Sequence, residues 1–205
     1  MIDMEYVIRK IRNRTPQPID IKQEYSVTIP LIKVKDSWHI IYEVRAKGLK
    51  RQPGEISFPG GKVEKGETYR EAAIRETVEE LNINKENINL VGELDYLVSR
   101  DNTIIHSFLA IIENVNLEDI KPNKSEVECI FTVPMDFFLE NEPELYYVDF
   151  NPVFSSDFPY NLIPNGKDYN WRISKYSVYF YNYNGYIIWG YTAKMTKNFM
   201  DIIKG

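Results

Sequence analysis

The chain has 205 residues, of which 43% are hydrophobic and 27% are charged, and its formal net charge is −5. This composition is typical of globular proteins, and the negative charge does not favour non-specific binding to nucleic acid or to an anionic membrane. The longest nearly apolar run, residues 104–112, is too short to span a bilayer, and the acidic start of the chain, residues 1–5, does not resemble a signal peptide. The single cysteine, Cys129, cannot form an intramolecular disulfide, and we expect it to be a small buried side chain. These features together favour a reduced, cytoplasmic protein.

The pattern of apolar residues predicts a chain in which helices and strands are mixed. Helical spacing and capping signals predict helices at residues 4–13, 67–82, 135–140 and 193–203. Runs of β-branched and aromatic residues predict strands at residues 25–34, 38–44, 88–99, 104–112, 129–133 and 180–189. A turn at residues 35–37 joins the first two strands into a hairpin, and residues 46–62, which are rich in glycine and proline, predict a long loop. Residues 141–187 hold many aromatic side chains among Pro, Asn, Gly and Asp, and we expect a structured aromatic loop there.

Charge is distributed unevenly along the middle of the chain. Basic side chains outnumber acidic ones in residues 44–62, and acidic side chains outnumber basic ones in residues 63–80. A site that holds both phosphates and divalent cations needs such a pairing, because the phosphates require positive groups and the cations require carboxylates.

Three glutamates lie close together on the predicted helix at residues 67–82. Glu76, Glu79 and Glu80 are spaced i, i+3 and i+4, so they share one face of the helix with Cβ atoms about 5–6 Å apart. Carboxylates held this close repel one another, and a cluster of hard oxygen ligands suits Mg²⁺ or Mn²⁺. The spacing alone also fits a solvated acidic face that is stabilised by pairs such as Arg75 with Glu79.

The same helix has signals for both of its ends and for its packing. Thr68 and Glu71 form a capping box, and Asn82 can adopt the left-handed conformation at the C-terminal end. The face opposite the glutamates is expected to dock on a sheet through three apolar residues, Ile74, Val78 and Leu81.

This helix and the glycines before it resemble the Nudix box, G-x5-E-x7-R-E-U-x-E-E-x-G-U, in which U is an aliphatic residue. The matching positions follow the pattern without gaps, and they are Gly61, Glu67, Arg75, Glu76, Glu79, Glu80 and Ile83. Two positions depart from it, because Thr77 replaces an aliphatic residue and Asn82 replaces a glycine. The change at Asn82 is mild, since Asn tolerates the left-handed conformation, whereas Thr77 is expected to weaken the packing of the helix slightly. The resemblance implies the Nudix fold, an α/β/α sandwich with a central mixed sheet, formed by residues 1–205 as a single domain with an aromatic-rich insertion at about 141–187.

The resemblance also implies a metal-dependent hydrolase that cleaves a nucleotide-linked diphosphate. The implied ligands of Mg²⁺ or Mn²⁺ are Glu76, Glu79, Glu80 and the carbonyl of Gly61. Arg75 and Glu67 are implied to orient these glutamates. In the implied reaction water attacks one phosphorus, while the metal neutralises the phosphate oxygens and activates the water.

The general base of this reaction is left open by the sequence. A glutamate of the box is one candidate, and a carboxylate on the loop before the strand at residues 129–133 is another. Glu126 is the candidate on that loop, with Glu128 behind it, because Glu126-Val127 and Val133-Pro134 resemble an E-V…V-P stretch of the family. The alternative is that Glu126 is a solvated loop residue.

The residues before the box resemble the signature of coenzyme A pyrophosphatases, L-L-T-x-R-S-x3-R-x3-G-x3-F-P-G-G. The positions in register are Arg45, Gly54, Phe58, Pro59, Gly60 and Gly61, whereas Ile41, Tyr42, Glu43 and Ala46 replace the L, L, T and S of the signature. Lys50 stands at the second arginine, and Arg51 follows it. Residues 185–193 look like the Y-x-I-W-G-x-T-A ending of the same branch. The resemblance implies that coenzyme A or a derivative is cut to adenosine 3′,5′-bisphosphate and 4′-phosphopantetheine, with substrate contacts from Arg45, Lys50, Arg51 and Phe58.

Two other functions stay open. The first is a Nudix pyrophosphatase for another nucleoside diphosphate, such as ADP-ribose or NADH, and the second is a Nudix-fold binding domain without catalysis. The expected partner is a small nucleotide substrate, with neither nucleic acid nor membrane, and a homodimer stays open. We expect His39 and His106 to be structural, since both lie in predicted strands without partners at the spacing of metal ligands.

Overall fold

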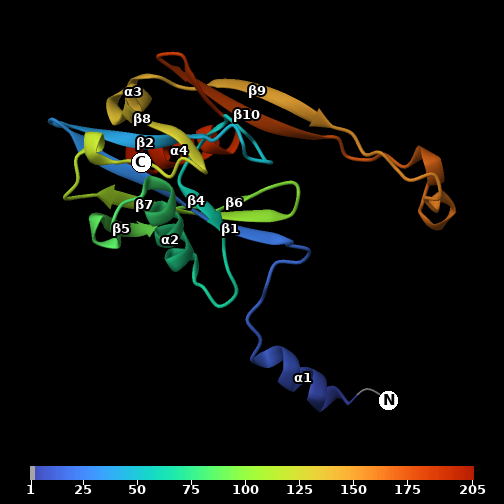
Figure 1. Ribbon diagram of the computed structural model, residues 1–205. Helices are drawn as coiled ribbons and strands as arrows, with labels where there is room; N and C mark the ends of the chain where they lie inside the picture. Colours follow the sequence, from blue (N-terminus) through green and yellow to red (C-terminus); the bar gives the residue numbers. More distant parts are fainter. Residues whose placement is uncertain (1–2) are drawn as a thin grey trace.

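The computed structural model describes residues 3–205 of the chain. Residues 1–2, which belong to the acidic start noted above, lie outside the described residues. The first element is helix α1 (Met4–Arg12), close to its predicted bounds, with Asp3 as its N-cap. Figure 1 shows that α1 stands apart from the rest of the molecule, and none of its residues is buried.

A mixed sheet forms the centre of the molecule. Its strands are β1 (Gln23–Val34), β2 (Ser37–Arg45), β3 (Ile56–Ser57), β4 (Gly60–Lys62), β5 (Ile88–Glu93), β6 (Leu97–Val98), β7 (Thr103–Ile112) and β8 (Val127–Pro134). The order is β3-β2-β1-β7-β5, while β4 pairs with β1, β6 with β7 and β8 with β2. The β1–β7 pair is parallel and the other pairs are antiparallel.

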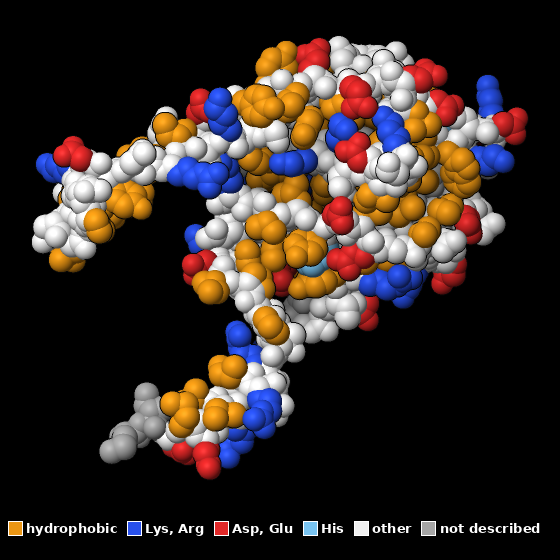
Figure 2. All heavy atoms as spheres, turned by 180° about the vertical axis from the view of Figure 1, so that it is seen from behind, with side chains coloured by type: hydrophobic (Ala, Val, Ile, Leu, Met, Phe, Trp, Pro, Cys, Tyr) orange, Lys and Arg blue, Asp and Glu red, His pale blue; other side chains and the backbone are white. Residues whose placement is uncertain are grey.

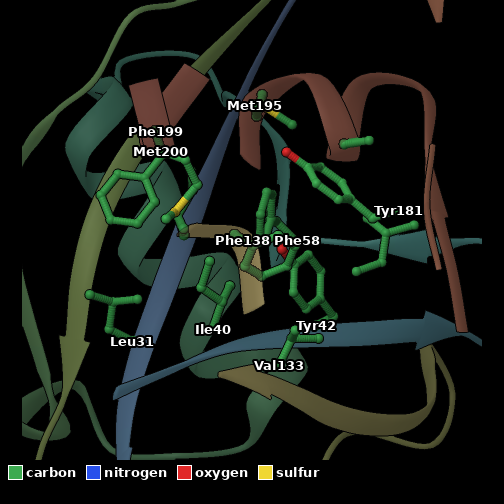
Figure 3. Packing of buried hydrophobic residues seen from close by; sticks show 13 residues of the cluster. Leu31, Ile40, Tyr42, Phe58, Val133, Phe138, Tyr181, Met195, Phe199 and Met200 are labelled. Atoms are coloured by element: carbon green, nitrogen blue, oxygen red, sulfur yellow. The ribbon is translucent and has the colours of Figure 1, made fainter. Parts of the chain in front are cut away.

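Helices cover both faces of this sheet. Successive side chains of a strand point to opposite faces, and in β2 Ile40 and Tyr42 join one core cluster while Ile41 joins another. The cluster on the side of Ile40 includes side chains from α3 (Met135–Glu140) and α4 (Gly190–Lys204), as Figure 3 shows. The cluster with Ile41 includes Leu81 of α2 (Tyr69–Leu81). The predicted α/β/α sandwich with a mixed sheet is therefore confirmed.

The ends of α2 form as the sequence predicts. Thr68 is the N-cap of a capping box with Glu71, and Asn82 ends the helix in the left-handed conformation with φ 53°. The predicted apolar stripe is wrong in part, because of its three residues only Leu81 is buried, whereas Ile74 and Val78 are half-buried. The buried side chains of α2 are Ala72, Ala73, Thr77, Glu80 and Leu81. The helix thus turns one of its glutamates toward the sheet.

Thr77 is better accommodated than its departure from the Nudix pattern suggests. Its side chain is fully buried, and its hydroxyl donates to the Ala73 carbonyl at 2.7 Å. The hydroxyl of Thr28 in β1 lies 2.8 Å from that of Thr77. The two buried hydroxyls therefore form a hydrogen bond with each other across the contact between α2 and the sheet, so neither lacks a partner.

The aromatic segment contains regular structure that the sequence did not predict. A second sheet has the order β11-β10-β9 and consists of β9 (Glu144–Phe150), β10 (Ser174–Tyr183) and β11 (Tyr186–Trp189). The prediction of a structured loop at 141–187 is therefore wrong where β9 and β10 form. The single strand predicted at 180–189 is divided by a turn at Asn184 and Gly185, both of which have positive φ. Figure 1 shows β9 and β10 leaving the body as a long ribbon.

The remaining differences from the prediction are smaller. The strand expected at 88–99 divides into β5 and β6, and the loop expected at 46–62 contains the short strands β3 and β4. Among residues 3–205, no helix is long and apolar enough to cross a membrane.

Candidate active site

The glutamates of α2 face the turn between β3 and β4. The Gly60 amide donates to the Glu80 carboxylate at 2.7 Å, and Glu80 is 5% exposed. A Cβ atom at Gly61 would collide with the Glu76 carboxylate, and one at Gly60 would lie 2.5 Å from the Ser26 carbonyl oxygen. Only glycine fits at Gly60, because the turn approaches the backbone of β1 so closely, whereas a side chain at Gly61 would displace the Glu76 carboxylate.

Arg75 holds three carboxylates around the outer side of this turn. Its guanidinium pairs with Glu67 at 2.9 Å, with Glu76 at 2.7 Å and with Glu79 at 3.3 Å, and it also donates to the Lys62 carbonyl at 3.2 Å. The hydrogen bond from Arg75 lowers the pKa of Glu67 below its usual value. This geometry fits the orienting function implied for Arg75 and Glu67.

A further carboxylate, Glu43 of β2, lies behind Glu80. Its side chain is 1% exposed, and among the described residues its Oε1 atom has no hydrogen-bond partner. Burial and the neighbouring Glu80 raise the pKa of Glu43 well above its ordinary value. In the sequence, Glu43 is marked only by its departure from the coenzyme A pyrophosphatase signature, and this departure is the one signal that could have found it.

The carboxylates around Glu80 crowd one another. Burial raises the pKa of Glu80 to about 7, against the opposing effect of the Gly60 amide, and the charges of Glu76 and Glu126 add to the rise. Burial likewise raises the pKa of Glu76. Buried carboxylates that disfavour their own charge are stabilised by a divalent cation, so this donor set fits Mg²⁺ or Mn²⁺.

The carboxylates do not yet form a complete coordination sphere. Across residues 3–205, no three His, Cys, Asp or Glu side chains converge in the arrangement of metal ligands. Glu79 is half-exposed and turned toward Arg75, whereas Glu76 and Glu80 point into the turn.

A cavity of about 1030 Å³ begins at these glutamates and extends toward the base of the β9–β10 ribbon. The predicted site residues that line it are Arg45, Arg51, Phe58, Gly61, Glu76, Glu80 and Glu126. Of the other predicted residues, Glu79 and Arg75 line a shallow depression on the outer side of α2, and Lys50 lies on neither wall. The far wall of the cavity includes aromatic residues that were not predicted as site residues, among them Tyr176, Trp189 and Tyr191.

Glu126, rather than Glu128, faces the glutamates of α2. It lies just before β8, and its carbonyl accepts from the Ala46 amide at 2.8 Å. Its charge contributes to the raised pKa of both Glu76 and Glu80. Glu128 is exposed and does not line the cavity.

The histidines and the cysteine lie outside the cavity lining. His39 contacts the Thr132 hydroxyl at 3.2 Å, and His106 contacts Glu93 at 2.7 Å while stacking on a tyrosine ring. Cys129 is only partly buried, so the expectation of a buried cysteine is wrong in part.

The fold and the glutamate helix define a Nudix protein. Residues 25–148 match the family model described as NUDIX domain, which covers more than half of the chain. The chain therefore belongs to the Nudix hydrolase family.

Relatives within this family include two coenzyme A diphosphatases. The peroxisomal coenzyme A diphosphatase NUDT7 of Mus musculus is 33% identical over 125 residues, which are 60% of this chain and 51% of the relative. The peroxisomal coenzyme A diphosphatase ndx-8 of Caenorhabditis elegans is 38% identical over 101 residues, which are 48% of this chain and 42% of the relative. The chain thus matches about half the length of these relatives. A solved Ap4A hydrolase of C. elegans superposes with a TM-score of 0.47 and 21% identity over 57% of this chain and 83% of that chain.

Proposed function

We propose that this protein hydrolyses the diphosphate of coenzyme A or its derivatives to adenosine 3′,5′-bisphosphate and 4′-phosphopantetheine. The observation that carries the proposal is a cavity in which buried glutamates and two arginines lie together. Carboxylates suit the cation and arginines suit the phosphates of such a substrate. The names of the two coenzyme A diphosphatases above support the choice of substrate.

The residues of the cavity divide the work between cation and substrate. Glu76, Glu79, Glu80 and the Gly61 carbonyl would hold Mg²⁺ or Mn²⁺. When bound, the cation would neutralise the diphosphate and activate the attacking water. Glu126 is our candidate for the group that accepts the proton of this water, since it faces the same cavity.

Phe58 and Arg45 both line the cavity near the proposed cation site. Phe58 is buried and stacks on Tyr42 with ring centroids 5.0 Å apart. We therefore propose that Phe58 forms a fixed part of the cavity wall against which the substrate packs. The Arg45 Nε atom is buried without a hydrogen-bond partner among the described residues. A phosphate oxygen of the substrate is a suitable acceptor for this group.

The choice among the three functions can be tested with one panel of substrates. We expect the protein with Mg²⁺ to convert coenzyme A faster than ADP-ribose or NADH, with products resolved by chromatography. Faster conversion of ADP-ribose or NADH would replace the proposed substrate by another nucleoside diphosphate. Tight binding without any product would favour the binding domain instead.

The carboxylates can be tested by substitutions that keep their shape. We expect Glu80→Gln and Glu79→Gln each to lower kcat by about 100-fold, the effect of losing one electrostatic stabiliser. We expect Glu126→Gln to lower kcat in a pH-dependent manner, because it removes the proposed proton acceptor. Glu128→Gln is the matched control, since Glu128 is two residues away and exposed, and its kcat should not change. Equal kcat for Glu126→Gln and Glu128→Gln across pH would remove Glu126 as the base.

The neighbouring cations Lys50 and Arg51 offer a test of substrate recognition. Coenzyme A has a 3′-phosphate that dephospho-coenzyme A lacks, and Arg51 lines the cavity whereas Lys50 does not. We expect Arg51→Ala to raise KM for coenzyme A about tenfold, the effect of losing one charge-assisted contact to phosphate. KM for dephospho-coenzyme A should change much less, and Lys50→Ala should change neither. Equal losses on both substrates would show that Arg51 does not contact the 3′-phosphate.

A further inference from the structure

The ribbon that leaves the body has an unpaired edge. We call β9, β10 and the loop between them, residues 151–173, the arm. Strand β9 is the edge of its sheet, so one side of its backbone pairs with β10 and the other side faces solvent. All seven residues of β9 are exposed, and Figures 1 and 2 show the arm extending away from the body.

This edge lacks most of the features that normally prevent a strand from pairing with another chain. Proteins protect exposed edges with charged side chains (lysine above all), proline, bulges or very short strands. Strand β9 contains neither lysine nor proline, its register with β10 runs through seven pairs without a bulge, and its charged residues are two acidic ones near its ends, Glu144 and Asp149. Its exposed side chains are mostly apolar, and they include Leu145, Tyr146, Tyr147, Val148 and Phe150.

The arm is also anchored, so the edge is held in place. The Arg100 guanidinium lies 3.6 Å from the Phe150 ring centroid and 5.5 Å from that of Tyr176, and it donates to the Ser174 hydroxyl at 2.6 Å. At the outer end, Phe154, Phe158 and Trp171 pack on one another. An ordered edge loses little conformational entropy when it pairs with another strand.

The sequence of β9 is suited to pairing with itself in the antiparallel direction. The only antiparallel register that pairs all seven residues has its two-fold axis at Tyr147. In that register Glu144 lies opposite Phe150 of the partner subunit, and Asp149 lies opposite the partner's Leu145. The acidic side chains therefore avoid one another, whereas a parallel in-register pair would place identical carboxylates side by side.

We propose that β9 is a dimerisation edge, which pairs antiparallel with β9 of a second copy of this chain around Tyr147. The pairing joins the two arm sheets into one continuous sheet and leaves neither β9 edge free, as a closed two-fold assembly requires. Seven paired residues bury less than the roughly 800 Å² per partner of a standard interface, so we expect a reversible dimer with Kd in the micromolar range. The proposal is independent of the catalytic function.

Two lysine substitutions on the same face of β9 test the proposed register. Tyr147→Lys places two lysines opposite each other on the two-fold axis and should weaken association about tenfold or more. Leu145→Lys adds the same charge to the same strand but places it opposite the partner's Asp149, so the dimer should persist or strengthen. Sedimentation equilibrium of the full chain over a range of concentrations measures both Kd values.

A mixing experiment separates the interface from the stability of the arm. Tyr147→Glu should be as monomeric as Tyr147→Lys, but an equimolar mixture of the two should associate again, because the heterodimer pairs a lysine with a glutamate. A wild-type chain that stays monomeric at 100-fold above micromolar concentration would overturn the proposal, and so would dimers of both Tyr147 variants. Equal weakening by Leu145→Lys and Tyr147→Lys, without recovery in the mixture, would likewise contradict this register.

Discussion

The buried carboxylates of the active site make the stability of the metal-free protein depend on pH. The pKa of Glu80 is raised to about 7 and that of Glu43 lies well above its ordinary value, both chiefly because of burial. A raised pKa means that the folded protein binds these protons more tightly than the unfolded chain does. Their stabilising contribution is therefore complete below about pH 4.5 and is lost as pH rises through about 7.

We expect Tm in the presence of a chelator to fall as pH rises from about 5 to about 7.5, and to fall less over the same range in Glu80→Gln. Mg²⁺ should raise Tm more at the higher pH, because it binds the charged carboxylates. Differential scanning calorimetry measures both effects. Parallel pH profiles for wild type and Glu80→Gln would show that Glu80 does not titrate in this range.

The Thr28–Thr77 contact predicts a coupled pair of substitutions. Thr77 donates to the Ala73 carbonyl, so the Thr28 hydroxyl is the donor between the two threonines. Thr77→Val leaves that buried donor without an acceptor and should cost about 1–3 kcal/mol. Adding Thr28→Val should recover most of this loss, as chemical denaturation of both variants would reveal. Additive losses in the double variant would contradict the coupling.

At the scale of elements, Arg100 connects the arm to the turn between β6 and β7. Its contacts with Phe150, Tyr176 and Ser174 join the arm to the body at this turn. We expect Arg100→Ala to speed amide hydrogen exchange about tenfold where β9 and β10 meet this turn, from losing a cation–π contact and a hydrogen bond. Arg172→Ala, an exposed arginine on the arm, is the matched control. Unchanged exchange in Arg100→Ala would show that packing alone holds the arm.

Helix α2 could be predicted almost completely because its signals are local. The capping box at Thr68 and the left-handed Asn82 involve contacts within a few residues, and both are confirmed. The burial of Glu43 could not be predicted, because it depends on Glu80, which is distant in sequence. Strand β9 was missed for a related reason, since all of its side chains are exposed and no alternation of apolar and polar residues marks it. Asn184-Gly185 is a typical hairpin signal, and it would have divided the single strand predicted at 180–189.

At the scale of the whole molecule, the resemblance to the Nudix box was enough to predict the α/β/α layers, but the order of the strands in the sheet could not be predicted. The central parallel pair joins β1 to β7, with Gln23 opposite Thr103. Such a pairing follows from how the intervening helix and strands pack, and no local pattern encodes it. The cavity has the same origin, because Arg45, Glu80 and Trp189 reach it from three distant segments.

The largest core cluster has a consequence for the synthesis of this protein. It contains Ile29 together with Phe199 and Met200 of α4, so its two sides come from segments that are far apart in the sequence. A nascent chain on the ribosome cannot close this core until α4 has emerged, and Ile40 and Tyr42 stay accessible until then. We expect nascent chains arrested before Gly190 to be cleaved readily by protease, and chains in which α4 has left the ribosome to resist it. Resistance in the arrested chains would show that the sheet closes without its last helix.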